Sequence, residues 1–389
     1  MSLKKWTMLS VFTGLIVAVA SCAPAATPTP TPIPKAPTTA PATPAAPAKT
    51  AEPAKPAAAA PTPSPKPAPA APTPTPRPAS IKFGSIQSAA FAAVYLTIDK
   101  GYFKEQGIDV EVIDFRTIQE VIAPLGTGQL DVTALPLSTP LMAAADRGID
   151  LKMVAAASST TSKFQHNWLM LRKDLKDSGQ VKTAADLKGM KVAIPSQGSI
   201  GEQTVQLMLE QGGLKPGEAE VIVVPLTEQA PAFANKAIAA SYTMEPQVAR
   251  IIQEGFADKW MPVGSFYGGQ AQTSVVVFGG TLLKDQDLAR RWMIAYVKGI
   301  RDYLKAVTTK QGFDEVVKAV SKYTPVKDPK TYELMELPYV DPNGALDKKS
   351  VEAQFKWWVE KGLYTGKKTI EDITDLSYVD YAAQKLGKQ

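Results

Sequence analysis

Short apolar segments that alternate with longer helical patterns constrain the fold of this chain more than any other feature. The alternation begins at Ile81 and continues for roughly 300 residues, which suffice for two domains of ordinary size. A strand, a helix and another strand in succession indicate parallel pairing, because the helix carries the chain back across the sheet. We expect strands over 81–86, 110–115, 132–135, 153–157, 168–171, 192–194, 221–224, 239–243 and 275–278, and helices over 89–100, 118–127, 139–147 and 285–308. The chain is therefore predicted to be an α/β protein with a largely helical C-terminal region.

The first 22 residues have the pattern of a secretory leader. Lys4 and Lys5 precede an apolar run from Met8 to Ala20, and the last four residues read VASC. These four resemble the site at which bacterial lipoprotein leaders are cut before a cysteine that is then lipid-modified. We therefore expect Cys22 to anchor the protein to the extracytoplasmic face of the cell membrane; an ordinary signal peptide and a membrane span are the alternatives. Cys22 is the only cysteine, so the exported part has no disulfide or thiol nucleophile.

Residues 23–80 are almost entirely Ala, Pro and Thr and hold 20 of the 33 prolines. A segment of this composition cannot bury a core, and its prolines favour an extended, polyproline-like tether of at most about 180 Å. We interpret it as a disordered spacer rather than as a wall-binding stalk.

The positive net charge belongs to the leader and the tether. The formal net charge is +6, of which Lys4 and Lys5 supply +2 and residues 35–77 supply +4, so residues 81–389 sum to zero. Because nucleic-acid binding requires a basic face, a neutral folded region argues against a nucleic-acid partner.

The segment from Thr183 to Leu209 is the clearest candidate for one half of a binding site. Thr183 and Asp186 have the spacing of a capping box, and Ser199 and Glu202 repeat that spacing before a second helix, after a short strand. The first N–H groups of the second helix have no partner within the helix, so they can face a ligand beyond the end of the strand. We expect the intervening polar turn, residues 196–199, to hydrogen-bond to the ligand from one side of the site; we call this turn the jaw.

Open α/β sheets bind ligands beyond the carboxyl ends of their strands, where the loops converge. In this chain those loops are rich in hydroxyl and amide side chains, hold several aromatic residues, and carry few charges. From them we select as ligand-binding candidates Gln87, Ser88, Phe91, Ser138, Thr139, His166, Ser196, Gln197, Gly198, Ser199, Tyr242 and Glu245.

Several of these candidates have a second interpretation. His166 is either a ligand contact or a histidine without a role at the surface or between domains. Phe91 lies four residues before Tyr95, a spacing that also suits the buried face of a helix. Tyr242 can face the cleft or the core, and Glu245 can cap the following helix instead of binding a ligand.

Catalytic motifs are scarce. His166 is the only histidine, and the chain has no G-x-S-x-G elbow, no G-x-x-x-x-G-K-[ST] loop and no G-x-G-x-x-G run. Paired carboxylates remain possible, but no spacing suggests them. We therefore expect a protein that is not an enzyme, with no catalytic residues, no metal site and no cofactor.

Four motifs resemble those of a known family: residues 100–108 (KGYFKEQGI), 128–132 (GQLDV), 185–189 (ADLKG) and 245–246 (EP). They are similar to the nitrate, sulfonate, taurine and thiamine-precursor binding proteins of ABC importers, a family that also includes riboflavin binders. The resemblance implies a type II periplasmic binding protein, with mixed sheets flanked by helices and a ligand cleft between two lobes. By analogy, lobe one comprises residues 81–165 plus 270–389, and lobe two comprises 166–269. It also implies permease and ATPase subunits as partners; we expect a monomer.

The resemblance leaves the ligand open. Fixed positive charge is sparse in the loops, which disfavours a small anion such as sulfonate, taurine or nitrate. Pyrimidine-binding members of the family tend to have a histidine where Phe91 falls, and the related pyrimidine-forming enzymes have a cysteine-rich motif; this chain has neither. Aromatic rings beside hydroxyls and amides suit a heteroaromatic, vitamin-like compound. Riboflavin is our first candidate and a thiamine precursor our second, with an anion binder and an enzyme related to pyrimidine synthesis as alternatives.

Overall fold

The computed structural model describes residues 77–389. The leader, Cys22 and nearly all of the tether lie outside the described residues, so the lipid anchor and the disordered spacer stay predictions. Within residues 77–389, no helix is both long and apolar enough to cross a membrane.

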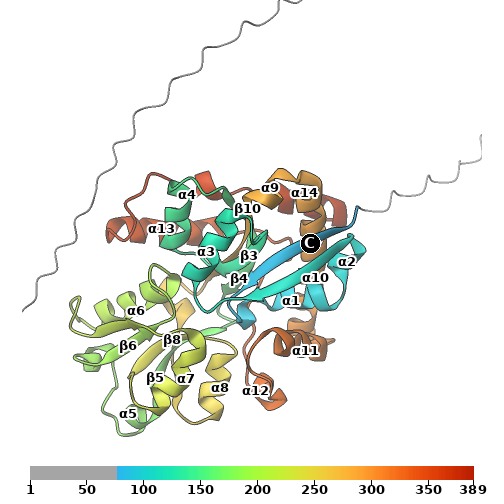
Figure 1. The fold of residues 1–389 in the computed structure, drawn as a ribbon. Coiled ribbons are helices and arrows are strands. Elements are labelled where there is room, and N and C mark those ends of the chain that lie inside the picture. The colour runs from blue at the N-terminus through green and yellow to red at the C-terminus, as the bar shows by residue number, and fades with distance from the viewer. Residues whose placement is uncertain (1–76) are drawn as a thin grey trace, which may run out of the picture. The chain divides into compact units, whose positions relative to one another are not determined.

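The first sheet has five strands in the order β2-β1-β3-β10-β4. Figure 1 labels β3, β4 and β10 of this sheet. β1 pairs in parallel with both β2 and β3, whereas β10 pairs antiparallel to β3 and β4. Its strands are β1 (Ala79–Ser85), β2 (Ile108–Asp114), β3 (Val132–Pro136), β4 (Leu151–Thr160) and β10 (Ala271–Gly279). One sheet is thus built from two segments that are far apart in the sequence.

The second sheet repeats this arrangement in the order β7-β6-β8-β5-β9. β6 pairs in parallel with β7 and β8, and β5 pairs antiparallel to β8 and β9. Its strands are β5 (Asn167–Arg172), β6 (Lys191–Ile194), β7 (Glu220–Val223), β8 (Ala240–Met244) and β9 (Ala257–Pro262). Both sheets are mixed, as the fold class predicted.

Helices flank both sheets. Beside the first sheet are α1 (Ala92–Asp99), α2 (Tyr102–Glu105), α3 (Ile118–Thr127), α4 (Thr139–Asp146), α9 (Gly280–Lys284), α10 (Gln286–Thr309), α11 (Phe313–Tyr323), α13 (Lys348–Glu360) and α14 (Ser377–Leu386). Beside the second sheet are α5 (Lys173–Asp177), α6 (Ile200–Gln211), α7 (Leu226–Ala234) and α8 (Gln247–Gln253). The short helix α12 (Pro329–Glu333) and the 3-10 turns η1 (Ala89–Phe91), η2 (Ala184–Leu187), η3 (Val263–Tyr267) and η4 (Glu371–Ile373) complete the set.

A buried aromatic cluster joins α10 to the first sheet. The Trp292 ring packs 5.2 Å from Phe103 and from Tyr296 and 5.3 Å from Phe278, measured between ring centroids. Trp292, Tyr296 and Phe278 are fully buried. Rings of this size bury enough apolar area to fix the long helix against the first sheet.

Most expected elements occur, but two features differ from the prediction. Each of the nine expected strands is present, whereas β9 was not predicted, because Asp258 and Lys259 interrupt its apolar pattern. The strand–helix–strand alternation predicts parallel pairing, yet β4, β5, β9 and β10 pair antiparallel. These four strands flank the segments where the chain passes from one sheet to the other, so no crossover helix joins them.

The chain passes between the sheets twice, through residues 161–166 and 263–270. A third connection comes from residues 328–336, which we call the strap; it includes α12 and reaches α8. Gln253 Nε2 donates to Asp328 Oδ2 at 2.8 Å, and Lys259 Nζ lies 2.9 Å from Glu336 Oε1. The C-terminal region thus makes side-chain contacts with the second sheet after the chain has returned to the first.

Candidate functional site

Several predicted site residues meet where the strand ends of the two sheets face each other. Thr139 N, at the start of α4, donates to Gly198 O at 2.7 Å, and Ser138 forms an antiparallel bridge with Ser199. We call this contact region, together with Ser88 and Glu245, the seam. A pocket that borders Ser199 and Tyr242 has a volume of only about 10 Å³, roughly one water molecule or less.

Glycine is required at position 198 for two reasons. Its φ is +64°, in the left-handed region that favours glycine, and a Cβ would lie 1.8 Å from Thr139 Oγ1. The two backbones approach this closely because neither Gly198 nor the start of α4 places a large side chain between them. The turn and α4 therefore form a fitted contact.

The start of α6 differs from the expected capping box. Glu202 Oε2 accepts from Gly198 N, and Ser199 Oγ donates to Ser196 O at 2.8 Å instead of accepting from the helix. Ser199 is nevertheless the residue that precedes the helix. The capping box predicted for Thr183 and Asp186 is confirmed at η2.

Glu245 is fully buried at the carboxyl end of β8. Its Oε2 accepts from Ala249 N at 3.0 Å, so the side chain caps α8, and its Oε1 accepts from Glu336 N of the strap at 3.2 Å. Its backbone oxygen accepts from Ala89 N at 3.0 Å and links it to the first sheet. Burial raises the pKa of Glu245 to about 8, because the charged form loses its hydration. The carboxyl group is therefore mainly protonated at neutral pH.

His166 is fully buried between the sheets, so its interpretation as a surface residue is wrong. Its Nε2 lies 3.3 Å from Thr273 Oγ1 on β10, and its Nδ1 has no hydrogen-bond partner within residues 77–389. Burial lowers the pKa of His166 to about 3, so the ring is uncharged under physiological conditions.

Tyr242 and Asn167 form the second-sheet side of the buried region. Asn167 Nδ2 donates to Tyr242 OH at 2.7 Å, and burial raises the pKa of Tyr242. The Tyr242 ring lies against the first turn of α6, where a Cβ on Gly201 would be 3.0 Å from its Cδ1. Tyr242 therefore contributes to the core and reaches the seam at its edge.

Three predicted residues lie away from the seam contacts. Phe91 is fully buried and packs edge-to-face on Tyr95, with ring centroids 6.4 Å apart, which fits the core interpretation. Gln87 Nε2 donates to Asp114 Oδ2 at 3.0 Å, and Gln197 is exposed. Ser88 remains at the seam, where its Oγ donates to Glu245 O at 3.4 Å.

Buried polar atoms without a partner gather around the seam. Among the described residues they include Ser138 Oγ, His166 Nδ1, Asn167 Oδ1, Ser274 Oγ and both side-chain polar atoms of Gln247. All belong to side chains that are at most 1% exposed. Leaving a buried polar atom without a hydrogen-bond partner costs about 1–3 kcal/mol of folding stability. A group of such atoms therefore indicates a place where a ligand could supply the missing partners. Sequence reasoning did not select Asn167, Gln247 and Ser274, although Asn167 and Gln247 lie in the polar loops.

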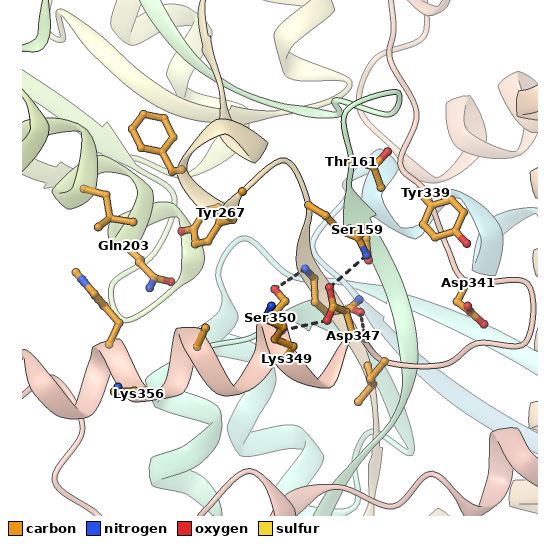
Figure 2. A pocket seen from close by; sticks show the side chains of 18 of the residues that line it. Ser159, Thr161, Gln203, Tyr267, Tyr339, Asp341, Asp347, Lys349, Ser350 and Lys356 are labelled. Atoms are coloured by element: carbon orange, nitrogen blue, oxygen red, sulfur yellow. Dashed lines mark hydrogen bonds between the residues drawn. The ribbon is translucent and has the colours of Figure 1, made fainter.

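A much larger cavity, of about 970 Å³, lies beside the two crossing segments. Figure 2 shows Gln203 and Tyr267 on one side of this cavity and Tyr339 and Asp341 on the other. One wall consists of α6 and η3, which lie beside the second sheet. The other walls come from the chain crossings at 161–166 and 263–270, and from α13 with residues 339–347 before it. None of the predicted site residues lines it.

The cavity wall includes five aromatic and three amide side chains. Gln203 is only 3% exposed, and its Oε1 has no partner within the described part of the chain. Tyr267 OH lies 3.0 Å from Thr204 Oγ1, which fixes its ring beside α6. Trp358 is fully buried in the core, whereas its neighbour Trp357 packs on the core and also lines the cavity.

Charges at the cavity do not favour an anion. Its ionisable residues are three acids, Asp341, Asp347 and Glu360, and two bases, Lys349 and Lys356. Within residues 77–389, no group of three or more His, Cys, Asp and Glu side chains could hold a metal ion.

The two mixed sheets and their helices define the fold of the type II periplasmic binding proteins, as the family resemblance implied. The periplasmic nitrate-binding protein NrtA of Synechocystis PCC 6803 has a TM-score of 0.67 at 17% identity, over 81% of this chain and 91% of that chain. The desulfurization enzyme DszB matches with a TM-score of 0.53 at 14% identity, over 80% and 100%. Likeness at this level establishes the fold, which carries binding proteins as well as an enzyme.

The chain belongs to the NMT1/THI5-like family, whose model matches residues 88–306, more than half of the chain. It is 24% identical over 252 residues to the riboflavin-binding protein RibY of Chloroflexus aurantiacus, which covers 64% of this chain and 67% of that protein. It is 23% identical over 209 residues to a protein of Brucella abortus, which covers 54% of this chain. The chain spans 61% of the length of that relative.

Proposed function

We propose that this protein is the extracytoplasmic substrate-binding component of an ABC importer. It captures a small uncharged heteroaromatic compound between the two sheets and delivers it to a permease that an ATPase drives. Riboflavin is the first candidate ligand and a thiamine precursor the second. The type II fold, the family membership and the lipoprotein-like leader support this proposal, and hinge closure of two lobes is its mechanism.

The observation that carries the choice of ligand is the lack of charge among the buried polar groups between the sheets. The His166 ring is neutral because burial lowers its pKa to about 3, and the Glu245 carboxyl is mainly protonated because burial raises its pKa to about 8. Among the described residues, Arg291 is the only buried Lys or Arg side chain, and it bonds to Asp287 and Gln106 near α2. The buried polar groups between the sheets thus offer hydroxyl, amide and imidazole groups but no fixed counter-charge for an anion.

A small anion is the weaker alternative for the same reason. Anion sites rely on cationic side chains or on free N–H groups at helix N-termini. At the start of α4 the Thr139 N–H is already bonded to Gly198 O. Nitrate, taurine or a sulfonate would have to displace this contact and would gain no cation in return.

The test is a titration of the full chain in detergent with riboflavin, a thiamine-precursor pyrimidine, taurine and nitrate. We expect riboflavin to bind and to stay bound in excess nitrate and taurine, and mass spectrometry to recover it unchanged. Competition by the anions would favour the anion-binding alternative. An altered product would favour an enzyme, and loss of that product in His166→Ala with binding retained would assign the chemistry to the imidazole.

The jaw at the start of α6 is tested by Gln197→Ala combined with Ser199→Ala. The Gln197 side chain is exposed, and Ser199 Oγ bonds only within its own turn, so the double variant should fold normally. We expect weaker ligand affinity and an unchanged melting temperature. Gln206→Ala, further along α6, is the matched control. Equal affinity in the double variant and the control would place the jaw elsewhere.

The lipid anchor is part of the same proposal. Replacing Cys22 with Ser removes the residue that would carry the lipid, so a membrane-bound protein should become soluble after export. Membrane association that persists in Cys22→Ser would argue for an uncleaved leader.

A further inference from the structure

The 970 Å³ cavity beside the crossing segments has walls that belong to different sheets. Gln203 and Leu207 come from α6, and Tyr267 from η3, all on the side of the second sheet. The opposite wall is α13, whose Ser350 Oγ accepts from Gln272 N of β10 at 2.9 Å and so belongs with the first sheet. A ligand in this cavity touches both halves of the protein, which is the requirement for driving lobe closure.

The side chains of the cavity suit a flat ring. Phe266 and Tyr267 on the second-sheet side, and Trp357 on α13, offer aromatic surfaces. Phe164 and Tyr339 add a tilted pair with centroids 5.9 Å apart. Aromatic walls with a few polar groups are typical of sites for heteroaromatic ligands.

Gln203 supplies a directional polar group. The residue is 3% exposed and lines the cavity, and its Oε1 lacks a partner in the described part of the chain. A ring N–H or an amide N–H of a ligand would satisfy this acceptor. A site that holds a buried acceptor in this way discriminates against compounds that cannot donate to it.

Size separates the cavity from the seam. The small pocket that borders Ser199 holds only about 10 Å³, too little for a ring, whereas 970 Å³ lies within the range of about 300–1,000 Å³ that is usual for sites of drug-sized ligands. Nitrate would be far too small to contact both walls. Three acids against two lysines also give an anion no electrostatic gain at this position.

We propose that this cavity holds the ring system of the ligand and is built for an uncharged, fused-ring heteroaromatic compound with a hydroxylated side chain. The inference rests on the proposed function and assigns the ring to Gln203, Tyr267 and Trp357, while the seam acts as the latch that closes the sheets. No sequence motif marks this site.

The experiment measures riboflavin affinity for the full chain in detergent, from the quenching of flavin emission by contact with aromatic side chains. Trp357→Ala and Gln203→Ala should each weaken binding about 10-fold, which is the loss expected for one aromatic contact or one buried hydrogen bond. Trp357→Phe keeps a ring, and Gln206→Ala changes the same residue type on α6 outside the cavity; both should stay within about 3-fold of the wild type.

A variant that fills the cavity covers the case in which truncation at Trp357 disturbs folding. Ala353 is exposed on α13 and lines the cavity, so Ala353→Trp adds bulk without removing core contacts. It should abolish riboflavin binding while the melting temperature stays at the wild-type value.

The outcomes separate this inference from the proposed function. If the wild type binds riboflavin and the Gln203, Trp357 and Ala353 variants, with wild-type melting temperatures, bind it equally well, the cavity assignment is overturned and the importer function stands. If the wild type binds neither riboflavin nor its ring alone, lumichrome, both the ligand class and the cavity assignment fail.

Discussion

The buried carboxyl group of Glu245 gives the protein a specific pH dependence of stability. Its pKa is about 8 in the folded protein, against an ordinary value of 4.5. Because the folded pKa is raised, the contribution of this group to stability is fully present below pH 4.5 and is lost as the pH rises through about 8. A tenfold difference in proton affinity between the folded and unfolded chains is worth about 1.4 kcal/mol, so the folded protein should lose about 2 kcal/mol of stability between pH 6.5 and 9 from this group alone.

Glu245→Gln removes the titrating group and keeps the size of the side chain. The amide NH₂ must face either Ala249 N–H or Glu336 N–H, so the variant loses one hydrogen bond, at a constant cost of about 1–3 kcal/mol at every pH. The free energy of unfolding of the variant should therefore lie below that of the wild type at pH 6.5 and approach or overtake it by pH 9.

The assay is urea unfolding followed by tryptophan emission at pH 5.5, 6.5, 8 and 9. Glu111→Gln replaces an exposed carboxyl on β2 and serves as the control, with a curve expected to run parallel to the wild type. If the curves of Glu245→Gln and the wild type also run parallel from pH 6.5 to 9, the pKa of Glu245 is not raised. The neutral His166 ring would then be the only one of the two buried groups that still favours a neutral ligand.

Two further predictions concern the seam and the buried ring of His166. Gly198→Ala should separate the sheets and weaken ligand binding, because the new Cβ would lie 1.8 Å from Thr139 Oγ1; Gly189→Ala has the same left-handed strain with no atom within 4 Å of its Cβ, and should lose stability but not affinity. Ligand titration and small-angle scattering would detect the difference, and identical behaviour of the two variants would refute the fitted contact. Because the folded pKa of His166 is depressed from 6.5 to about 3, its contribution is present above pH 6.5 and lost as the pH falls towards 3, by about 1.4 kcal/mol for each tenfold rise in proton concentration. His166→Gln should be less sensitive to acid in thermal melts between pH 6.5 and 4, and equal sensitivity would contradict the buried neutral ring.

Local patterns in the sequence predicted the elements because each is decided within a few residues. The apolar face of α3 and its Thr117 cap fall within one short segment, and the predicted bounds match the observed helix. β9 was not predicted, because it is an edge strand that carries Asp258 and Lys259 and so lacks a continuous apolar pattern. The antiparallel pairing of β10 with β4 depends on contacts across more than 100 residues, which no local pattern encodes.

The seam was partly foreseeable, whereas the cavity was not. Loops at the carboxyl ends of strands converge in any sheet of this kind, so Ser138, Gly198 and Glu245 could be selected before their contacts were known. Gln203 looks like an ordinary helical residue, and its partner wall at Trp357 is more than 150 residues away. Only the folded arrangement shows that these two side chains share one cavity.

The strap changes how the two halves can move. Two chain crossings define an axis, and a body joined at two points is free to swing about the line between them. The strap adds a third attachment, since Gln253 bonds to Asp328 and Glu336 meets Lys259 and Glu245. Swinging therefore requires these contacts to release or the strap to travel with the second sheet. If the two halves close on a ligand as proposed, the rate at which the strap contacts break limits how fast the halves can separate and release it.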